Sequence, residues 1–204
     1  MMELSELQVD ALTETFNIAL GEAAATFSQL AGEEVLLDVP SVEFVSRDEL
    51  LKRLGRAVGS RDDRVCGVSQ RFWGEARFAS ETLLLFAEAG GLEVVRRIVG
   101  GNTGADDVTE LEQDALAEIG NIIINACMAS ISNLFAEEMQ GSLPQVLFCA
   151  ANRVLSEELD GRHVLVASIN MTLAEHSIRG VVLFLLDSPS VQSFVRKVEH
   201  AFAI

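Results

Sequence analysis

One eight-residue phrase occurs twice in this chain, and its repetition limits the folds that the sequence can adopt. The two copies are DALTETFN at residues 10–17 and DALAEIGN at residues 114–121, 104 positions further on. Both have the pattern Asp-x3-Glu-x2-Asn, and each is followed at the same distance by a proline, Pro40 or Pro144. Self-similarity at a fixed distance indicates a repeated structural unit. The sequence therefore predicts two similar halves related by a pseudo-twofold axis.

Hydrophobic periodicity predicts the same order of elements in both halves. Each half starts with a long helix, at about residues 4–31 and 109–139, and continues with a strand, a short helix, two more strands and a final helix. In the first half these later elements are expected at 35–45, 48–55, 65–78, 81–89 and 91–100. In the second half they are expected after Pro144 and at 151–159, 163–173, 177–186 and from Ser190 onward.

A segment rich in glycine and aspartate, GGNTGADD at 100–107, is typical of a joint between the two halves. We therefore expect one domain over residues 1–204, made of repeats at about 1–100 and 105–204. Long helices combined with strands joined by hairpins are typical of an α+β fold rather than of βαβ crossovers. The strands are expected to pair antiparallel in one sheet that carries the long helices, in an order that periodicity leaves open.

The net charge of −16 argues against functions that depend on positive charge. Such a chain is not expected to bind nucleic acid or a membrane, whereas an acidic surface suits a basic protein partner or simply keeps the protein soluble. No apolar segment is expected to reach the ~18–20 residues of a membrane helix. The acidic start, MMELSELQVD, does not resemble a signal peptide, so we expect a cytoplasmic protein.

The cysteines and histidines give no sign of a metal site. Cys66, Cys127 and Cys149 lie far apart with no CxxC pattern, and they are expected to be reduced core residues. The three histidines have no metal-ligand spacing with one another or with a cysteine. A metal site belonging to the protein itself is therefore not expected.

Helical geometry puts the polar residues of each repeated phrase on one face of its helix, because positions three and four apart share a side. These residues are Asp10, Glu14 and Asn17 in the first copy and Asp114, Glu118, Asn121 and Asn125 in the second. The apolar side that should pack on the sheet consists of Leu12, Phe16, Leu20, Ala23, Phe27 and Leu30, and of Leu116, Ile123, Ile124, Cys127, Ile131 and Leu134. Both polar stripes are predicted to point toward solvent or a partner.

A polar stripe on a single helix is usually no more than a solvated surface, and a capping role is the interpretation we favour for Asp10 and Asp114. Recurrence of Glu and Asn at one spacing points to a shared role, since asparagine is a mediocre helix former. A carboxylate can hold a lysine ammonium, and a carboxamide can orient a water molecule. Both functions suit in-line hydrolysis of a phosphoryl group, in which positioning supplies most of the acceleration.

Neither stripe contains a basic residue that could bind phosphate or a cluster that could hold a metal. Neither is therefore expected to be a complete phosphatase site, and the carrier of the phosphate must bring the metal and the cations. A conventional small-molecule enzyme has no support, because the chain lacks a P-loop, a GxSxG motif and a GxGxxG motif after a strand.

In its motifs the sequence resembles the CheC/CheX/FliY family of phosphatases, which act on the phosphorylated chemotaxis response regulator CheY. The resemblance is carried by the two Asp-x3-Glu-x2-Asn phrases, by Pro40 and Pro144, and by EIGNIIINACMASIS at 118–132, which is similar to the second helix of the family. Two motif copies in a chain of this length point to the CheC-like branch.

This resemblance implies a CheC-like α+β fold in which two long helices lie side by side on one face of a shared antiparallel sheet. The implied substrate is an aspartyl phosphate on a CheY-like receiver domain, which would hold Mg²⁺ itself, so that the protein needs no cofactor of its own. A CheD-like protein is a further candidate partner. The implied catalytic residues are Glu14 and Glu118, which would engage the receiver's lysine, and Asn17 and Asn121, which would aim the water; Asp10, Asp114 and Asn125 would support them.

The first copy departs from the family pattern more than the second. It has Phe16 where the second copy has Gly120, and Gly21 where the second has Asn125. Glu118 and Asn121 are therefore the pair expected to work if only one does. The alternative hypothesis is a non-catalytic binding module that docks a receiver, a CheD-like deamidase or a flagellar switch. The presence of both Glu/Asn pairs speaks against it, because related switch proteins lack them.

Overall fold

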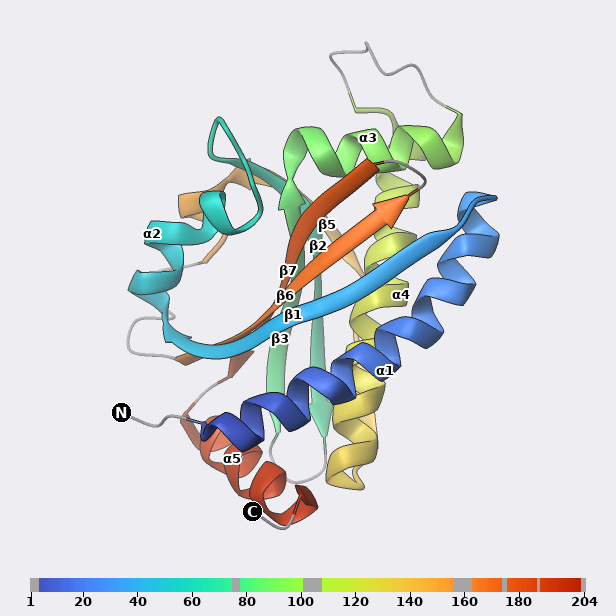
Figure 1. Ribbon diagram of the computed structural model, residues 1–204. Coiled ribbons are helices and arrows are strands. Elements are labelled where there is room, and N and C mark those ends of the chain that lie inside the picture. Colours follow the sequence, from blue (N-terminus) through green and yellow to red (C-terminus); the bar gives the residue numbers. More distant parts are fainter. Residues whose placement is uncertain are drawn as a thin grey trace.

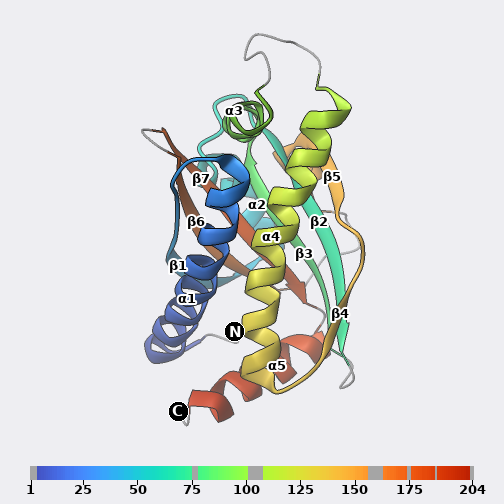
Figure 2. The same ribbon diagram turned by 90° about the vertical axis from the view of Figure 1, so that its right-hand side faces the viewer.

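Two long helices lie side by side on one face of a sheet in the computed structural model (Figures 1 and 2), which describes residues 4–74, 78–100, 108–155, 163–173, 176–186 and 188–202. These helices, α1 (Glu6–Ala31) and α4 (Glu110–Phe135), have 26 residues each. The side-by-side arrangement confirms the expected α+β, CheC-like fold.

Each long helix starts with a capping box. The hydroxyl of Ser5 accepts a hydrogen bond from the backbone N–H of Gln8, whose side chain accepts one from the backbone N–H of Ser5. Thr109 and Glu112 form the same reciprocal pair at the start of α4. Because these bonds satisfy N–H groups that have no partner within the helix, they fix where each helix begins.

The described residues form one sheet of seven strands, and every pair of neighbours is antiparallel. In spatial order the strands run β1-β6-β7-β3-β2-β4, and β5 also pairs with β2. The strands are β1 (Val35–Ser46), β2 (Arg64–Gly74), β3 (Ala79–Ala87), β4 (Met139–Gly141), β5 (Gln145–Ala150), β6 (His163–Leu173) and β7 (His176–Leu186).

The pairing is symmetric with respect to the two halves of the chain. β3 and β7, the last strand of each half, pair at the centre of the sheet. The first strand of each half pairs with a strand of the other half, because β1 lies next to β6 while β4 and β5 lie next to β2. Each half therefore completes the sheet of the other.

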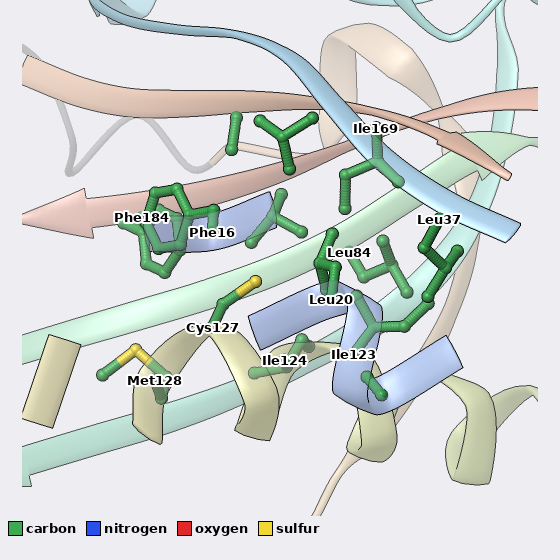
Figure 3. Packing of buried hydrophobic residues seen from close by; sticks show 14 of the residues in the cluster. Phe16, Leu20, Leu37, Leu84, Ile123, Ile124, Cys127, Met128, Ile169 and Phe184 are labelled. Carbon is green, nitrogen blue, oxygen red and sulfur yellow. The ribbon is translucent and has the colours of Figure 1, made fainter. Parts of the chain in front are cut away.

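The main core lies between the two long helices and the sheet (Figure 3). The rings of Phe16 on α1 and Phe184 on β7 stack with centroids 5.5 Å apart and planes 6° from parallel. From α4, Ile123, Ile124 and Cys127 are fully buried in the same cluster. The predicted apolar faces of both helices are thus confirmed, except that Leu30 is 44% exposed and Leu134 is only half-buried.

Three shorter α-helices complete the described part of the fold. On the other face of the sheet, α2 (Arg47–Ala57) and a 3₁₀ turn (Ala151–Arg153) cover a second core cluster that includes Leu50 and Leu54. α5 (Ser188–Phe202) packs against the main core. α3 (Glu88–Val99) is joined to the start of α4 by a buried ion pair, in which Nε of Arg96 lies 2.6 Å from Oε1 of Glu112. Hydrogen bonds from the Thr109 backbone and from Arg96 lower the pKa of Glu112.

Several sequence predictions are wrong in detail. The second long helix was expected to reach residue 139 but ends at Phe135, and the unpredicted strand β4 begins at Met139. Of the helix expected at 151–159, the structure describes residues 151–155, and these form only a 3₁₀ turn over the first three residues. The strand expected at 65–78 ends at Gly74 among the described residues. The expected joint lies almost entirely outside the described residues, at 101–107.

Burial separates the three cysteines. Cys66 and Cys127 are buried, and burial raises the pKa of each thiol to about 12. Cys149 is only half-buried, at the edge of the second core cluster, so the expectation that all three are core residues is wrong for it. All three are free thiols.

The expectation that no segment is long and apolar enough for a membrane helix is wrong, since one helix meets both criteria of length and composition. α4 is long enough to span a membrane, and its most apolar 18-residue window has a mean hydropathy of 1.4. Of that window, 44% is buried inside the protein. A core helix of a soluble protein has the same properties, so this feature is weak evidence for a membrane span.

Candidate functional site

The four carboxylates of the repeated phrases lie on the outer faces of the two long helices. Glu14 and Asp10 on α1 are exposed, and so are Glu118 and Asp114 on α4. Among the residues that the structure describes, none of these side chains makes a hydrogen bond or an ion pair. Each carboxylate is therefore free to receive a cationic group from another molecule.

The capping role that we favoured for Asp10 and Asp114 is wrong. The N-caps of α1 and α4 are Ser5 and Thr109, and both aspartates lie inside their helices. Each aspartate lies five positions after its cap, which is more than one helical turn. The two aspartates add negative charge beside Glu14 and Glu118.

Asn17 is half-buried, and its amide bonds to the edge strand β1. The backbone N–H of Val39 donates to Oδ1 of Asn17 at 2.8 Å, and Nδ2 of Asn17 donates to the carbonyl of Val39 at 3.2 Å. Val39 lies where the register between β1 and β6 shifts, between Asp38 and Ser41, and it precedes Pro40. The Asn17 side chain therefore serves as the hydrogen-bonding neighbour of an interrupted strand.

This contact makes Asn17 a determinant of stability. Asn17→Ala leaves both backbone groups of Val39 without their partner, and we expect it to lower the free energy of unfolding by about 1–3 kcal/mol. Urea unfolding followed by circular dichroism measures the loss. Asn121→Ala is the matched control and should cost clearly less, since the Asn121 side chain bonds to no backbone group of a strand. Equal losses in the two variants would contradict this role of Asn17.

Asn121 is also half-buried but has different partners. Its Oδ1 accepts hydrogen bonds from Nε2 of Gln70 at 3.3 Å and from Nδ2 of Asn125 at 2.7 Å. Gln70 Nε2 also donates to the carbonyl of Ser142 at 3.1 Å, so Gln70 stands between Asn121 and the segment that precedes Pro144. Among the described residues, Nδ2 of Asn121 has no hydrogen-bond acceptor. In the second copy both N–H groups of the amide are therefore free, whereas in the first copy the Val39 carbonyl takes one of them.

The differences between the two copies follow from the sequence. Asn125 occupies the position that is Gly21 in the first copy, so α1 has no second asparagine to hold Asn17. Val39 corresponds to Leu143, but Val39 is 2% exposed and Leu143 is 85% exposed. The segment before Pro144 is thus turned outward, and it does not meet its asparagine directly.

Gly120 brings α4 unusually close to the sheet beside Asn121. A Cβ atom added at this position would lie 2.4 Å from Cβ of Val68 on β2, which is far inside van der Waals contact. At the matching position of α1 a phenylalanine, Phe16, fits between helix and sheet. The glycine therefore allows the helix to carry Asn121 within reach of Gln70, two residues further along β2.

Sequence reasoning did not find Gln70. Its side chain is 3% exposed and faces the helices from the middle of a strand. The signal was a glutamine at an inward-facing position of the alternating stretch VCGVSQRFW, 65–73. A polar residue at such a position requires a hydrogen-bonding partner. The sequence could therefore have indicated Gln70 as a candidate partner for one of the two asparagines.

A groove of about 620 Å³ runs between α1 and α4. Its wall includes Ile18, which is 60% exposed, and small residues such as Ala19 and Ala126. Among the described residues that line it, Glu22 is the only ionisable one. Because it holds no nucleophile with a neighbouring base, the groove offers no hydrolytic chemistry of its own, and the two outer stripes remain the candidate sites.

The stripes can position groups but cannot bind phosphate by themselves. Neither α1 nor α4 contains a lysine, an arginine or a histidine. Within the described part of the chain, no group of three or more His, Cys, Asp and Glu side chains could hold a metal ion. An exposed carboxylate and a free amide N–H one helical turn apart can hold a cation and the oxygen of a water molecule. This arrangement can complete a phosphate site that another molecule brings.

Comparisons with known proteins show which proteins this chain is similar to. The chain is 26% identical over 181 residues to the CheY-P phosphatase CheC of Bacillus subtilis, covering 85% of this chain and 84% of the relative. FliY of Thermotoga maritima has the same fold, with a TM-score of 0.74 and 17% identity over 98% of this chain and all of that one. The FliM middle domain of Helicobacter pylori matches with a TM-score of 0.67 and 13% identity over 95% and 99%. No protein-family model matches the sequence.

Proposed function

We infer that this chain, which belongs to the CheC/CheX/FliY family, hydrolyses the aspartyl phosphate of a CheY-like response regulator. The observation that carries this proposal is the outward carboxylate with an amide one turn later, present on both long helices. Similarity to a CheY-P phosphatase supports the substrate. Proteins that share only the fold, such as the FliM middle domain, support no activity by themselves.

In the proposed reaction the receiver supplies the aspartyl phosphate, the Mg²⁺ and the lysine. Glu118 holds the lysine ammonium and so fixes the orientation of the two proteins. Nδ2 of Asn121 donates to the oxygen of a water molecule and places it in line with the phosphorus atom. A bond forms from the water oxygen to phosphorus while the bond to the aspartate oxygen breaks, and the receiver's aspartate leaves as a carboxylate. The two protons of the water stay on the released inorganic phosphate.

The two copies are proposed to be unequal. Both N–H groups of the Asn121 amide are free, whereas Asn17 uses its Oδ1 and one N–H to bond the Val39 backbone. These two bonds hold the Asn17 amide against β1, and breaking them to turn the amide toward a phosphoryl group raises the barrier at Glu14 and Asn17. We therefore assign most of the activity to Glu118 and Asn121.

The test is the decay of a phosphorylated receiver with and without the protein. A CheY-like receiver with a labelled phosphoryl group should lose its label faster when the protein is added. The double variant Asn17→Ala/Asn121→Ala should abolish the acceleration while keeping the helical circular dichroism signal of the parent. An unchanged rate in a folded double variant would refute the proposal.

A second candidate function is docking without hydrolysis. It is favoured by the fold that this chain shares with the FliM middle domain, which has been crystallised in a FliG–FliM complex. The partner would be a receiver, a CheD-like deamidase or a flagellar switch protein. Pulldown of a partner by both the parent and the double variant, with no phosphatase activity in the parent, would select this function.

A further inference from the structure

Gln70 has a buried side-chain amide whose nitrogen donates both to Asn121 and to the segment before Pro144. Its side chain is 3% exposed, and its Nε2 donates both to Oδ1 of Asn121 and to the carbonyl of Ser142. Its Oε1 is buried and has no hydrogen-bond partner among the described residues. An unpaired buried oxygen destabilises the folded protein, so an apolar residue would suit this place better unless the amide has a task.

We propose that Gln70 is a positioning residue for the phosphatase reaction and that it acts only through Asn121. This inference rests on the proposed function. The two lone pairs of Oδ1 accept from Gln70 and Asn125, so the carboxamide of Asn121 is held in one orientation. In that orientation Nδ2 is the part of the amide that stays free for a water molecule or a phosphoryl oxygen.

The shared donor explains why the orientation cannot reverse. The Ser142 carbonyl accepts a hydrogen bond from Nε2 of Gln70, so this end of the Gln70 amide faces Ser142 and Asn121. A reversed Asn121 amide would then place its own N–H against that donor, which is unfavourable. Asn125 alone is a weaker restraint, because its side chain is exposed to water.

The other half of the protein shows what happens without such an amide. Ser69 on β2 pairs with Gln145, and Ser168 on β6 pairs with Ser41. Gln145 and Ser41 correspond to each other because they are 104 positions apart, so Ser69 corresponds to Ser168. The residue that corresponds to Gln70 is therefore Ile169, which is 1% exposed and has no donor. Asn17 in that half bonds to the Val39 backbone through Oδ1 and one N–H. The buried glutamine thus lies on the side where the asparagine amide is held through its oxygen alone, and on the other side a strand backbone holds the amide through both its oxygen and its nitrogen.

Gln70→Met tests the proposal, because methionine fills a similar volume without hydrogen bonds. We expect kcat for receiver dephosphorylation to fall about 10- to 100-fold, as for a misplaced catalytic group, with KM changed less than about threefold. In the Asn121→Ala background, Gln70→Met should cause no further loss. In the Asn17→Ala background it should cause its full loss. A further loss in the Asn121→Ala background would overturn the proposal, since Gln70 would then act by another route.

Ile169→Met is the matched control at the corresponding position of the other half. It places the same side chain in the same layer of the core and should leave kcat unchanged. If Ile169→Met lowers kcat as much as Gln70→Met does, the effect is one of core packing and the positioning role is refuted.

A spectroscopic measurement tests the orientation without relying on activity. The side-chain amide resonances of Asn121 are compared between the ¹H–¹⁵N spectra of the parent and of each variant. They should shift in Gln70→Met and should not shift in Ile169→Met. Asn121 resonances that do not move in Gln70→Met would overturn the inference even in an active enzyme. If the Asn121 resonances shift in Gln70→Met but the parent has no phosphatase activity, the proposed function is refuted and the contact between Gln70 and Asn121 stands.

Discussion

Asn121→Ala is expected to slow receiver dephosphorylation about 100-fold, which is the usual cost of removing one preorganised donor from a reacting centre. Asn17→Ala is expected to slow it less than about threefold, because two hydrogen bonds to the Val39 backbone hold the Asn17 amide against β1. The measurement is the single-turnover decay of a labelled receiver at saturating concentrations of each variant. The rates are compared at a temperature where both variants are fully folded.

Glu14→Gln and Glu118→Gln form the matched pair for the carboxylates. If each carboxylate works together with the asparagine one turn away, Glu118→Gln should slow dephosphorylation more than Glu14→Gln does. Equal losses in Asn17→Ala and Asn121→Ala would show that the two copies work alike, and the assignment of activity to the second copy would then be wrong.

Gly120→Ala is expected to lower the free energy of unfolding by about 2 kcal/mol, even though alanine is the better helix former. The new methyl group would lie 2.4 Å from two carbon atoms of Val68, whose β-branched side chain is held in a central position of the sheet. Relief of this overlap requires α4 to move away from β2, which carries Asn121 away from Gln70. Urea unfolding measures the stability, and dephosphorylation should slow about tenfold through this displacement.

Gly21→Ala is the control for this prediction. Gly21 lies on the matching helix, and a Cβ atom there would meet nothing within 4 Å. The same substitution should therefore stabilise the protein by about 1 kcal/mol through helix propensity alone. A Gly120→Ala variant that is as stable as the parent would show that α4 can move at no cost.

Much of the fold could be predicted because its signals are local. The two long helices follow from apolar positions at helical spacing, and the outward carboxylates Glu14 and Glu118 follow from the same periodicity. Strand order could not be predicted, since the pairing of β1 with β6 depends on contacts between the halves. β4 was missed because a three-residue strand at the end of a long apolar helix has no pattern of its own.

The site could be predicted only as far as each helix determines it. Spacing placed Glu118 and Asn121 one turn apart, but it gave no information on what the amide would bond to. The contact of Asn17 depends on a register shift in an edge strand, and that of Asn121 depends on Gln70 and Ser142, which are 72 positions apart in the chain. Such contacts form only when the sheet is assembled, so a pattern within a single helix cannot report them.

The exchange of first strands between the halves has a consequence for how the protein is made. Val35 at the start of β1 pairs with Leu173 at the end of β6, so an emerging chain holds β1 without its neighbour until most of the polypeptide has left the ribosome. Pairing between strands so far apart in the sequence is slow, and until it occurs the unpaired edge of β1 is prone to aggregation. A nascent chain stalled before His163 should be a target for chaperones and proteases, however well its first helix has formed.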